Sequence, residues 1–203
     1  MISSPVGSSS SSSVPSSILE PLRGALGARV VRRAKGEPAT PASVLLPLVD
    51  RGGHVHVWLT RRPETMKQHR GQVAFPGGKR DPGETALEAA LREADEELGF
   101  APALVDVLGG LDDLVTTTGF VISPFVGWLR EDVVARPNAG EIARAFCVPL
   151  AAFVSTEPRP HFLRGSGITR IAPSYAVDGE LVWGATARIM RDLVTVVRAV
   201  VSG

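Results

Sequence analysis

Acidic side chains crowd the end of one predicted helix, at Glu93, Asp95, Glu96 and Glu97. Negative charge is unfavourable near a helix C-terminus, and Glu93 repels Glu97 across one turn; each effect costs roughly a few tenths of a kcal/mol in water. Spacings of three and four residues place Glu93, Glu96 and Glu97 on adjoining parts of one helix surface. Because clustered carboxylate oxygens bind hard divalent cations, the pattern indicates a metal site. A solvated acidic helix face is the alternative interpretation.

The helix that carries these acids is expected to run from Thr85 to Leu98. Its apolar residues recur at the spacing of a single buried face, at Leu87, Ala90, Leu91, Ala94 and Leu98. Thr85 followed three residues later by Glu88 predicts a capping box at the start, and Gly99 predicts the stop. Local sequence therefore defines both ends of the helix and the side that faces the core.

The charge of the chain changes sign just before this helix. The segment from Arg61 to Arg80 contains six cationic residues and one acid, whereas the segment from Asp81 to Glu97 contains seven acids and one cation. Arginine side chains bind phosphate oxygens through paired donors, and carboxylates bind the metal ion that accompanies a polyphosphate. Gly77-Gly78 precedes the change of sign, where the backbone can approach a ligand closely. This order predicts a site for a metal-bound polyphosphate.

The same stretch resembles the signature of the Nudix hydrolases. That signature is a glycine, five residues, a glutamate, seven residues, and then arginine, glutamate, an aliphatic residue, any residue, two glutamates, any residue, glycine and an aliphatic residue. The chain matches it at Gly78, Glu84, Arg92, Glu93, Ala94, Glu96, Glu97, Gly99 and Phe100. The resemblance implies an α+β fold, an α/β/α sandwich with a mixed β-sheet between helices. It also implies hydrolysis of a phosphorus anhydride with Mg²⁺ or Mn²⁺ as the cofactor.

The resemblance also assigns roles to individual residues. The expected metal ligands are the carboxylates of Glu93, Glu96 and Glu97 and the backbone carbonyl of Gly78. The candidate catalytic carboxylates are Glu93, Glu96 and Glu141. Of these, Glu93 or Glu141 would take the proton of the attacking water, and a surface carboxylate is the alternative for Glu141. Glu84 and Arg92 are expected to pair and to hold the preceding loop on the helix.

A second resemblance covers the basic segment directly upstream, from Leu59 to Gly78, which ends in Phe-Pro-Gly-Gly. This segment resembles the motif of the coenzyme A pyrophosphatase branch of the Nudix family. The matching positions are Leu59, Thr60, Arg62, Gly71, Phe75, Pro76, Gly77 and Gly78. Pro63 and Lys67 depart from the motif, and Lys67 keeps the positive charge without the paired donors of arginine. The residues expected to bind the substrate are Arg62, Lys67, Arg70, Gly71, Phe75 and Gly77.

The expected reaction is therefore cleavage of the diphosphate of coenzyme A, or of its derivatives, to 3',5'-ADP and 4'-phosphopantetheine or acyl-phosphopantetheine. A Nudix hydrolase for another nucleoside diphosphate derivative, such as ADP-ribose, NADH or a nucleoside triphosphate, is the nearer alternative. A non-hydrolytic nucleotide-binding module is the more distant one. Such a module would be free to lose the glutamates, and this chain keeps all of them.

Length and composition indicate one globular domain and a tail. The chain has 203 residues, of which 44% are hydrophobic and 21% charged. Residues 1–17 contain ten serines and no charge, which is typical of a disordered tail. Residues 18–40 are expected to form a helical or linker segment with a short or broken helix, and residues 41–203 the Nudix domain. A net charge of +1 gives no reason to expect binding to nucleic acid or a membrane.

The expected partner is a small nucleotide substrate, bound by a monomer or a homodimer. Cys147 is the single cysteine, so no internal disulfide can form and a reducing compartment is expected. That compartment is the cytoplasm in the first interpretation. The alternative is an organelle matrix, because residues 1–36 are rich in serine and arginine with Glu20 as their one acid, a composition that suits a transit segment.

Short apolar or alternating runs predict the strands of the sheet, at residues 43–49, 54–60, 72–75, 104–111, 120–129, 141–148, 171–177 and 180–183. Arg51-Gly52-Gly53 and Asp178-Gly179 each predict a hairpin turn. Pro124 indicates an edge or a bulge. Residues 156–167 are expected to be a loop, and residues 184–201 a closing amphipathic helix.

Overall fold

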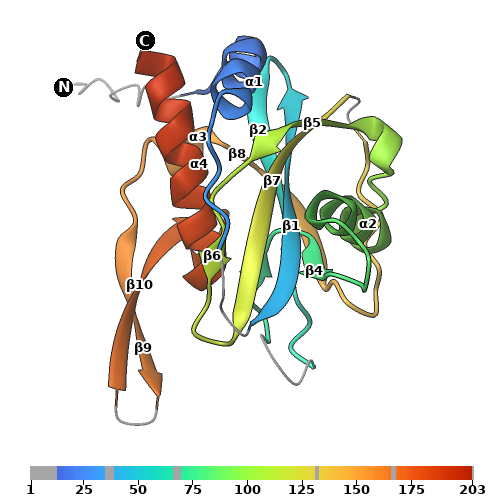
Figure 1. Cartoon of the computed structure of the whole chain (residues 1–203). Coiled ribbons are helices and arrows are strands. Elements are labelled where there is room, and N and C mark those ends of the chain that lie inside the picture. The colour runs from blue at the N-terminus through green and yellow to red at the C-terminus, as the bar shows by residue number, and fades with distance from the viewer. Residues whose placement is uncertain (1–12, 35–38, 66–69, 131–132, 166–167, 203) are drawn as a thin grey trace, which may run out of the picture.

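The structure, a computed structural model, describes residues 13–34, 39–65, 70–130, 133–165 and 168–202 (Figure 1). The helical elements are the short 3-10 helices η1 (Ser16–Ile18) and η2 (Pro102–Leu104) and the α-helices α1 (Leu19–Gly27), α2 (Ala86–Leu98), α3 (Ala151–Val154) and α4 (Gly184–Ser202). The strands of the main sheet are β1 (Thr40–Arg51), β2 (His54–Arg61), β3 (Val73–Ala74), β4 (Gly77–Lys79), β5 (Val105–Gly110), β6 (Leu114–Val115), β7 (Phe120–Leu129) and β8 (Arg144–Pro149). A smaller sheet contains β9 (Arg159–Gly165), β10 (Ile168–Val177) and β11 (Glu180–Trp183). None of the described helices is both long enough and apolar enough to cross a bilayer.

Strand β1 is the centre of the main sheet. It pairs in parallel with β7 along residues 40–48, and antiparallel with β2 and β4. β2 in turn pairs with β3 and β8, and β7 pairs with β5 and β6, all of them antiparallel. One parallel pair among antiparallel pairs makes this a mixed sheet, as the sequence predicts.

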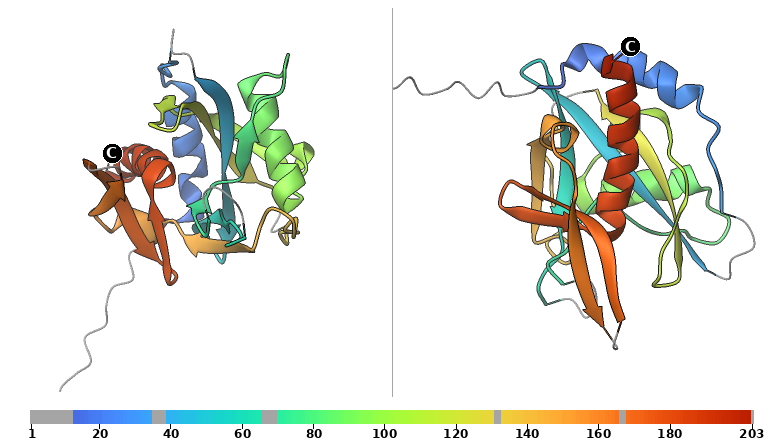
Figure 2. Two further views of the ribbon diagram at one scale, coloured as in Figure 1. Left: turned by 90° about the horizontal axis from the view of Figure 1, so that it is seen from below. Right: turned by 90° about the vertical axis from the view of Figure 1, so that its left-hand side faces the viewer.

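Helices cover both faces of this sheet (Figure 1). Because successive strand residues point to opposite faces, Leu45 and Val49 of β1 join the core under α2, whereas Leu46 and Leu48 join the larger core on the other side. That second core lies under α1 and α4, which are side by side (Figure 2). The three layers form the α/β/α sandwich of an α+β fold, which confirms the predicted fold class.

The segment expected to be helical or a linker contains the short helix α1, which packs against this sandwich. α1 fully buries Leu22 and Leu26, which lie four residues apart on one face of the helix. Arg23 also donates a hydrogen bond from Nη1 to Asp106 Oδ1 of β5 at 3.2 Å. These contacts join α1 to the packed core and to the main sheet. The predicted disordered tail falls largely on residues 1–12, which lie outside the described part of the chain.

Both predicted hairpin turns are present. Arg51 pairs with His54 across Gly52 and Gly53, which have φ values of 62° and 81°, and Asp178-Gly179 joins β10 to β11. The predicted loop at residues 156–167, however, contains strand β9. This strand pairs with β10 in a hairpin that projects from the main sheet (Figure 2). Proline and arginine at the start of β9 weaken its strand pattern in the sequence.

Two further strand predictions are corrected in part. β7 lies between β1 and β5, so Pro124 is not in an edge strand, but it lies between the last pair with β5 at Phe125 and the first pair with β6 at Ile122, where the ladder is irregular. The proline still joins the sheet through its carbonyl, which accepts a hydrogen bond from the backbone N–H of Leu111 at 2.9 Å. β8 begins at Arg144 and not at Glu141, so Glu141 lies in the turn before the strand.

Candidate active site

Helix α2 has the boundaries that local sequence predicts. Thr85 Oγ1 accepts a hydrogen bond from the N–H of Glu88 at 3.2 Å, and Glu88 Oε2 accepts one from the N–H of Thr85 at 2.8 Å. Gly99 ends the helix in the left-handed conformation, with φ 72°, which favours glycine. Ala94 and Leu98 are buried against the sheet. The helix is therefore capped at both ends and packed along one face.

Arg92 donates hydrogen bonds to three acids on the outer side of α2. Its Nε and Nη2 donate to the two carboxylate oxygens of Glu84 at 2.9 and 3.1 Å, and its Nη1 donates to Glu93 and Glu96 at 3.0 Å each. Nη2 also donates to the backbone carbonyl of Lys79 at 3.1 Å. The hydrogen bonds from Arg92 lower the pKa of Glu84. Arg92 thus ties α2 to the end of β4, which is the arrangement that a structural pairing with Glu84 requires.

Glu93 lies directly against Gly78. A Cβ atom at Gly78 would fall 2.6 Å from Glu93 Cδ and 2.7 Å from Glu93 Oε2, so glycine leaves the room that this carboxylate occupies. Burial raises the pKa of Glu93, and Arg92 acts in the opposite direction. Two of the predicted metal-binding groups, the Gly78 backbone and the Glu93 carboxylate, are therefore neighbours.

Glu97 is the most buried of the described acids, with 3% of its surface exposed. The backbone N–H of Gly77 donates to its Oε2 at 3.3 Å. Burial, followed by the negative charge of Glu93, raises the pKa of Glu97 to about 8, although the positive charge of Arg62 opposes this rise. A buried carboxylate beside a second carboxylate is unfavourable without a compensating cation.

Glu96 does not join this pair. Its side chain is 58% exposed and turns toward Arg92. Across the described ranges, no three side chains of His, Cys, Asp or Glu lie close enough together to hold a metal ion. Of the three expected carboxylates, Glu93 and Glu97 lie next to the backbone of Gly77 and Gly78, whereas Glu96 pairs with Arg92. Oxygen donors and buried negative charge fit a hard divalent cation such as Mg²⁺ or Mn²⁺.

Glu141 approaches this pair from a turn after β7. The N–H of Asn138 donates to the backbone carbonyl of Glu97 at 3.0 Å and holds the turn at the C-terminal end of α2. The charge of Glu141 raises the pKa of both Glu93 and Glu97. The negative charge of Glu141, in a distant turn, therefore acts on both of these acids of α2.

Arg62 begins the basic segment that follows β2 and lies near the buried acids. The N–H of Arg62 donates to the carbonyl of Gln72 at 3.0 Å and closes the base of this segment. Arg62 is half-buried, and its positive charge acts on the buried carboxylate of α2. Arg70 is exposed, and Gly71 has φ 59°, in the left-handed region. Lys67 lies outside the described residues.

Two residues of the upstream motif have packing roles. A Cβ atom at Gly77 would fall 2.7 Å from Val44 Cγ1 and 2.8 Å from Val44 Cα, so β4 approaches β1 this closely because the residue is glycine. Phe75 is buried, and its ring belongs to the larger core. The ring of Phe75 therefore packs in the core, with 3% of the residue exposed.

The backbone contacts at the end of α2 are not predictable from the sequence. The N–H groups of Arg136 and Asn138 donate to the carbonyls of Leu98 and Glu97, at 2.8 and 3.0 Å. The last carbonyls of any helix need such donors. The sequence carries no signal of which distant loop supplies them, and the proline and asparagine of this loop indicate a connection only.

Comparison with known proteins places this site in a family. Residues 39–164 match the NUDIX domain. The chain is 39% identical over 156 residues to the Nudix hydrolase NudL of Yersinia enterocolitica, described as uncharacterized, and the match covers 75% of this chain and 78% of that protein. NudL of Yersinia pestis, also described as uncharacterized, is 37% identical over 155 residues, which cover 75% of this chain and 77% of that protein.

Solved structures show the same fold. A protein from Deinococcus radiodurans superimposes with a TM-score of 0.53 at 18% identity, over 78% of this chain and 88% of its own. A MutT/nudix family protein from Enterococcus faecalis gives a TM-score of 0.53 at 14% identity, over 83% of this chain and 64% of its own. At these identities the likeness concerns the fold alone. The domain match and the sequence relatives extend it to the family, and the chain belongs to the Nudix hydrolases.

Proposed function

We propose that this Nudix pyrophosphohydrolase cleaves the diphosphate of coenzyme A, or of a derivative, to 3',5'-ADP and 4'-phosphopantetheine or its acylated form. One observation carries the choice of substrate. The segment 59–78, which resembles the coenzyme A pyrophosphatase motif, is joined to the buried acids by the hydrogen bond from Gly77 to Glu97. Arg62 of the same segment acts electrostatically on Glu97. These two contacts support a single site that contains the residues of the motif and the candidate metal ligands.

The carboxylates of Glu93 and Glu97 and the backbone carbonyl of Gly78 would hold a Mg²⁺ or Mn²⁺ ion, with Glu96 at the rim. A cation in such a site withdraws charge from phosphorus and lowers the pKa of a bound water. The residues of the chain hold these metal-binding groups in position. Arg92 holds Glu93 at 3.0 Å and is held in turn by Glu84, so the acids of α2 keep one arrangement relative to β4.

We favour Glu141 over Glu93 as the general base. Glu93 accepts a hydrogen bond from Arg92 and lies against Gly78. Glu141 is exposed, and its charge acts on Glu93. As the oxygen of water attacks one phosphorus, Glu141 would take the proton of that water. The bond from this phosphorus to the bridging oxygen breaks, and the departing phosphate keeps the electron pair.

The basic segment would bind the negative charge of the substrate. Guanidinium groups donate paired hydrogen bonds to phosphate oxygens, and Arg62 and Arg70 are the described arginines of the segment proposed for this role. Lys67 is proposed as a third cation from its sequence position. Coenzyme A carries a 3'-phosphate in addition to its diphosphate, so it presents more negative charge to such a segment than ADP-ribose does.

Product identification tests this function. The purified protein is incubated with coenzyme A and Mg²⁺, and the products are separated and weighed by mass spectrometry; 3',5'-ADP and 4'-phosphopantetheine are expected. A parallel preparation of Glu97→Gln controls for contaminating hydrolases. ADP-ribose, NADH and a nucleoside triphosphate are expected to give lower kcat/KM. A higher kcat/KM for one of these would contradict the substrate assignment, and no hydrolysis of any of them with Mg²⁺ or Mn²⁺ would contradict the activity.

A further inference from the structure

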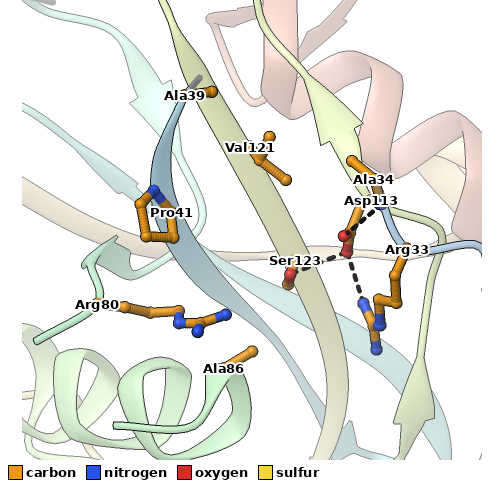
Figure 3. A pocket seen from close by; sticks show the side chains of 9 residues that line it. All are labelled: Arg33, Ala34, Ala39, Pro41, Arg80, Ala86, Asp113, Val121 and Ser123. Carbon is orange, nitrogen blue, oxygen red and sulfur yellow. Dashed lines mark hydrogen bonds and ion pairs between the residues drawn. The ribbon is translucent and has the colours of Figure 1, made fainter. Parts of the chain in front are cut away.

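A cavity of about 370 Å³ lies beyond the N-terminal end of α2 (Figure 3). Its lining includes Pro41 of β1 and Val121 and Ser123 of β7. Each of them is an even number of residues away from Leu45 of β1 or Phe125 of β7, whose side chains pack under α2. The cavity is therefore on the face of the sheet that α2 covers. Its volume is within the range of small-molecule sites. The carboxylates of the candidate active site do not line it.

Two arginines enter this cavity from opposite sides, and the first of them is matched by an acid (Figure 3). Arg33 Nη1 donates to Asp113 Oδ1 at 2.6 Å. Asp113 also accepts hydrogen bonds from Ser123 Oγ at 2.8 Å and from the N–H of Ala34 at 3.0 Å. Both oxygens of this buried carboxylate are therefore occupied, and its charge is balanced by Arg33.

Arg80 is the second arginine, and its charge is not matched within the cavity. Its backbone N–H donates to the carbonyl of Pro41 at 3.1 Å, which fixes the residue at the wall. Its side-chain Nε is buried and has no hydrogen-bond partner among the residues that the structure describes. Glu84 interacts with Arg80 electrostatically, but its oxygens already accept hydrogen bonds from Arg92 and from the N–H of Asp81. The lining thus carries two guanidinium groups against one carboxylate.

We propose that this cavity binds a small organic anion, whose carboxylate or phosphate group pairs with Arg80 while its apolar part lies against Pro41, Val121 and Ala86. A guanidinium group binds either oxyanion through paired donors. A buried donor without an acceptor is unfavourable, and such a ligand supplies the acceptor. The small wall residues leave room for a body larger than an inorganic ion. This site does not depend on which diphosphate the active site hydrolyses.

A binding experiment on the full chain uses three probes, which distinguish the contribution of the ligand's charge from that of its apolar part. Benzoate carries a carboxylate on an apolar ring, benzamide is its neutral counterpart, and inorganic phosphate is an anion without an apolar part. Backbone amide signals of Val121 and Ser123 and the side-chain Nε–H signal of Arg80 are followed by ¹⁵N–¹H spectroscopy during titration. Benzoate is expected to shift these signals saturably and more tightly than phosphate does. Equal shifts with benzamide, or no saturable shift with any anion, would overturn the proposal.

Two variants and one control locate the binding. Arg80→Met keeps the length of the side chain and removes its charge, so benzoate affinity is expected to fall at least about tenfold. Ala86→Leu keeps the arginine and fills the cavity, and it is expected to cause a similar loss even if Arg80→Met proves unstable. Lys79→Met removes the exposed neighbouring cation and is expected to leave the affinity unchanged. An equal loss in Lys79→Met, or benzoate-induced shifts confined to Arg62 and Gly77, would contradict this site.

Discussion

The backbone N–H of Gly77 lies 3.3 Å from Glu97 Oε2, and this hydrogen bond joins β4 to the last turn of α2. The next residue, Gly78, lies against the carboxylate of Glu93. Two successive glycines of the strand thus contact two acids that are one helical turn apart. The helix and the strand are both held in place by other contacts, so the pair of acids has a defined position relative to the backbone of β4.

Replacing Gly78 by Ala is expected to lower kcat/KM at least about a hundredfold, because the new Cβ would occupy the position of the Glu93 carboxylate and displace it. Gly24→Ala is the matched control, since its Cβ would meet no atom within 4 Å. It should leave turnover unchanged and raise the free energy of unfolding by about 0.5–1 kcal/mol, as alanine is favoured over glycine inside a helix. Wild-type turnover in Gly78→Ala would show that the contact with Glu93 has no role in the reaction.

Glu97→Gln is expected to change how stability depends on pH. The pKa of Glu97 is about 8 in the folded protein against an ordinary value of 4.5, so the stability it contributes is complete below pH 4.5 and is lost as the pH rises toward 8. In EDTA, the free energy of unfolding of the wild type should fall from about pH 5 to about pH 8 by roughly 1–3 kcal/mol more than that of Glu97→Gln.

Denaturant unfolding at the two pH values measures this difference, and Mg²⁺ provides the second readout. Because the ionised carboxylate is the form that binds a cation, Mg²⁺ should stabilise the wild type more at the higher pH and should stabilise Glu97→Gln weakly at both. Equal pH slopes in the two proteins would mean that Glu97 is not a proton-binding group of the folded state.

Arg62→Ala is expected to raise KM for coenzyme A by about 10–100-fold, since a hydrogen bond to a charged group contributes roughly 1.5–3 kcal/mol. The increase should be smaller for ADP-ribose, which lacks the 3'-phosphate. Arg191→Ala, on the exposed side of α4, is the control and should leave KM unchanged. Steady-state kinetics on both substrates check this, and equal increases for the two would argue against selectivity for coenzyme A.

Glu141→Gln is expected to lower kcat by about 10²–10⁴-fold, the usual contribution of a general base. Its effect on KM should be small, because the side chain is proposed to act on the water and not on the phosphates. Glu64→Gln removes another exposed acid and serves as the comparison. If kcat survives in Glu141→Gln and is lost in Glu93→Gln, the proton goes to Glu93 instead.

Leu22→Ala tests whether the segment before β1 is part of the domain. Leu22 is fully buried between α1 and the sheet, so the cavity left by this substitution should lower the free energy of unfolding by about 2–5 kcal/mol. Val30→Ala, at a residue that is 90% exposed, should change it by less than about 0.5 kcal/mol. Equal and small effects in denaturant unfolding would favour the interpretation of this segment as a linker.

The acidic helix is predictable from sequence because its determinants are local. The capping contacts of Thr85 and Glu88 and the left-handed Gly99 each involve residues within one turn, and the helical repeat alone places Arg92 beside Glu96. The hairpin turn between β1 and β2 is local in the same sense. The fold class follows as well, because alternating and helical apolar patterns require layers on both sides of one sheet.

The burial of Glu97 and the exposure of Glu96 depend on the tertiary structure. They are neighbours in the sequence, yet one side chain is 58% exposed and the other residue 3% exposed, because successive helix residues point about 100° apart and only one direction meets β4. Phe75 likewise lies in the basic motif but turns into the core. The sequence by itself determined which charged groups the chain carries and their order along α2. Which of them are buried together, and therefore which have a shifted pKa and a need for a cation, depends on desolvation by segments far away in the chain.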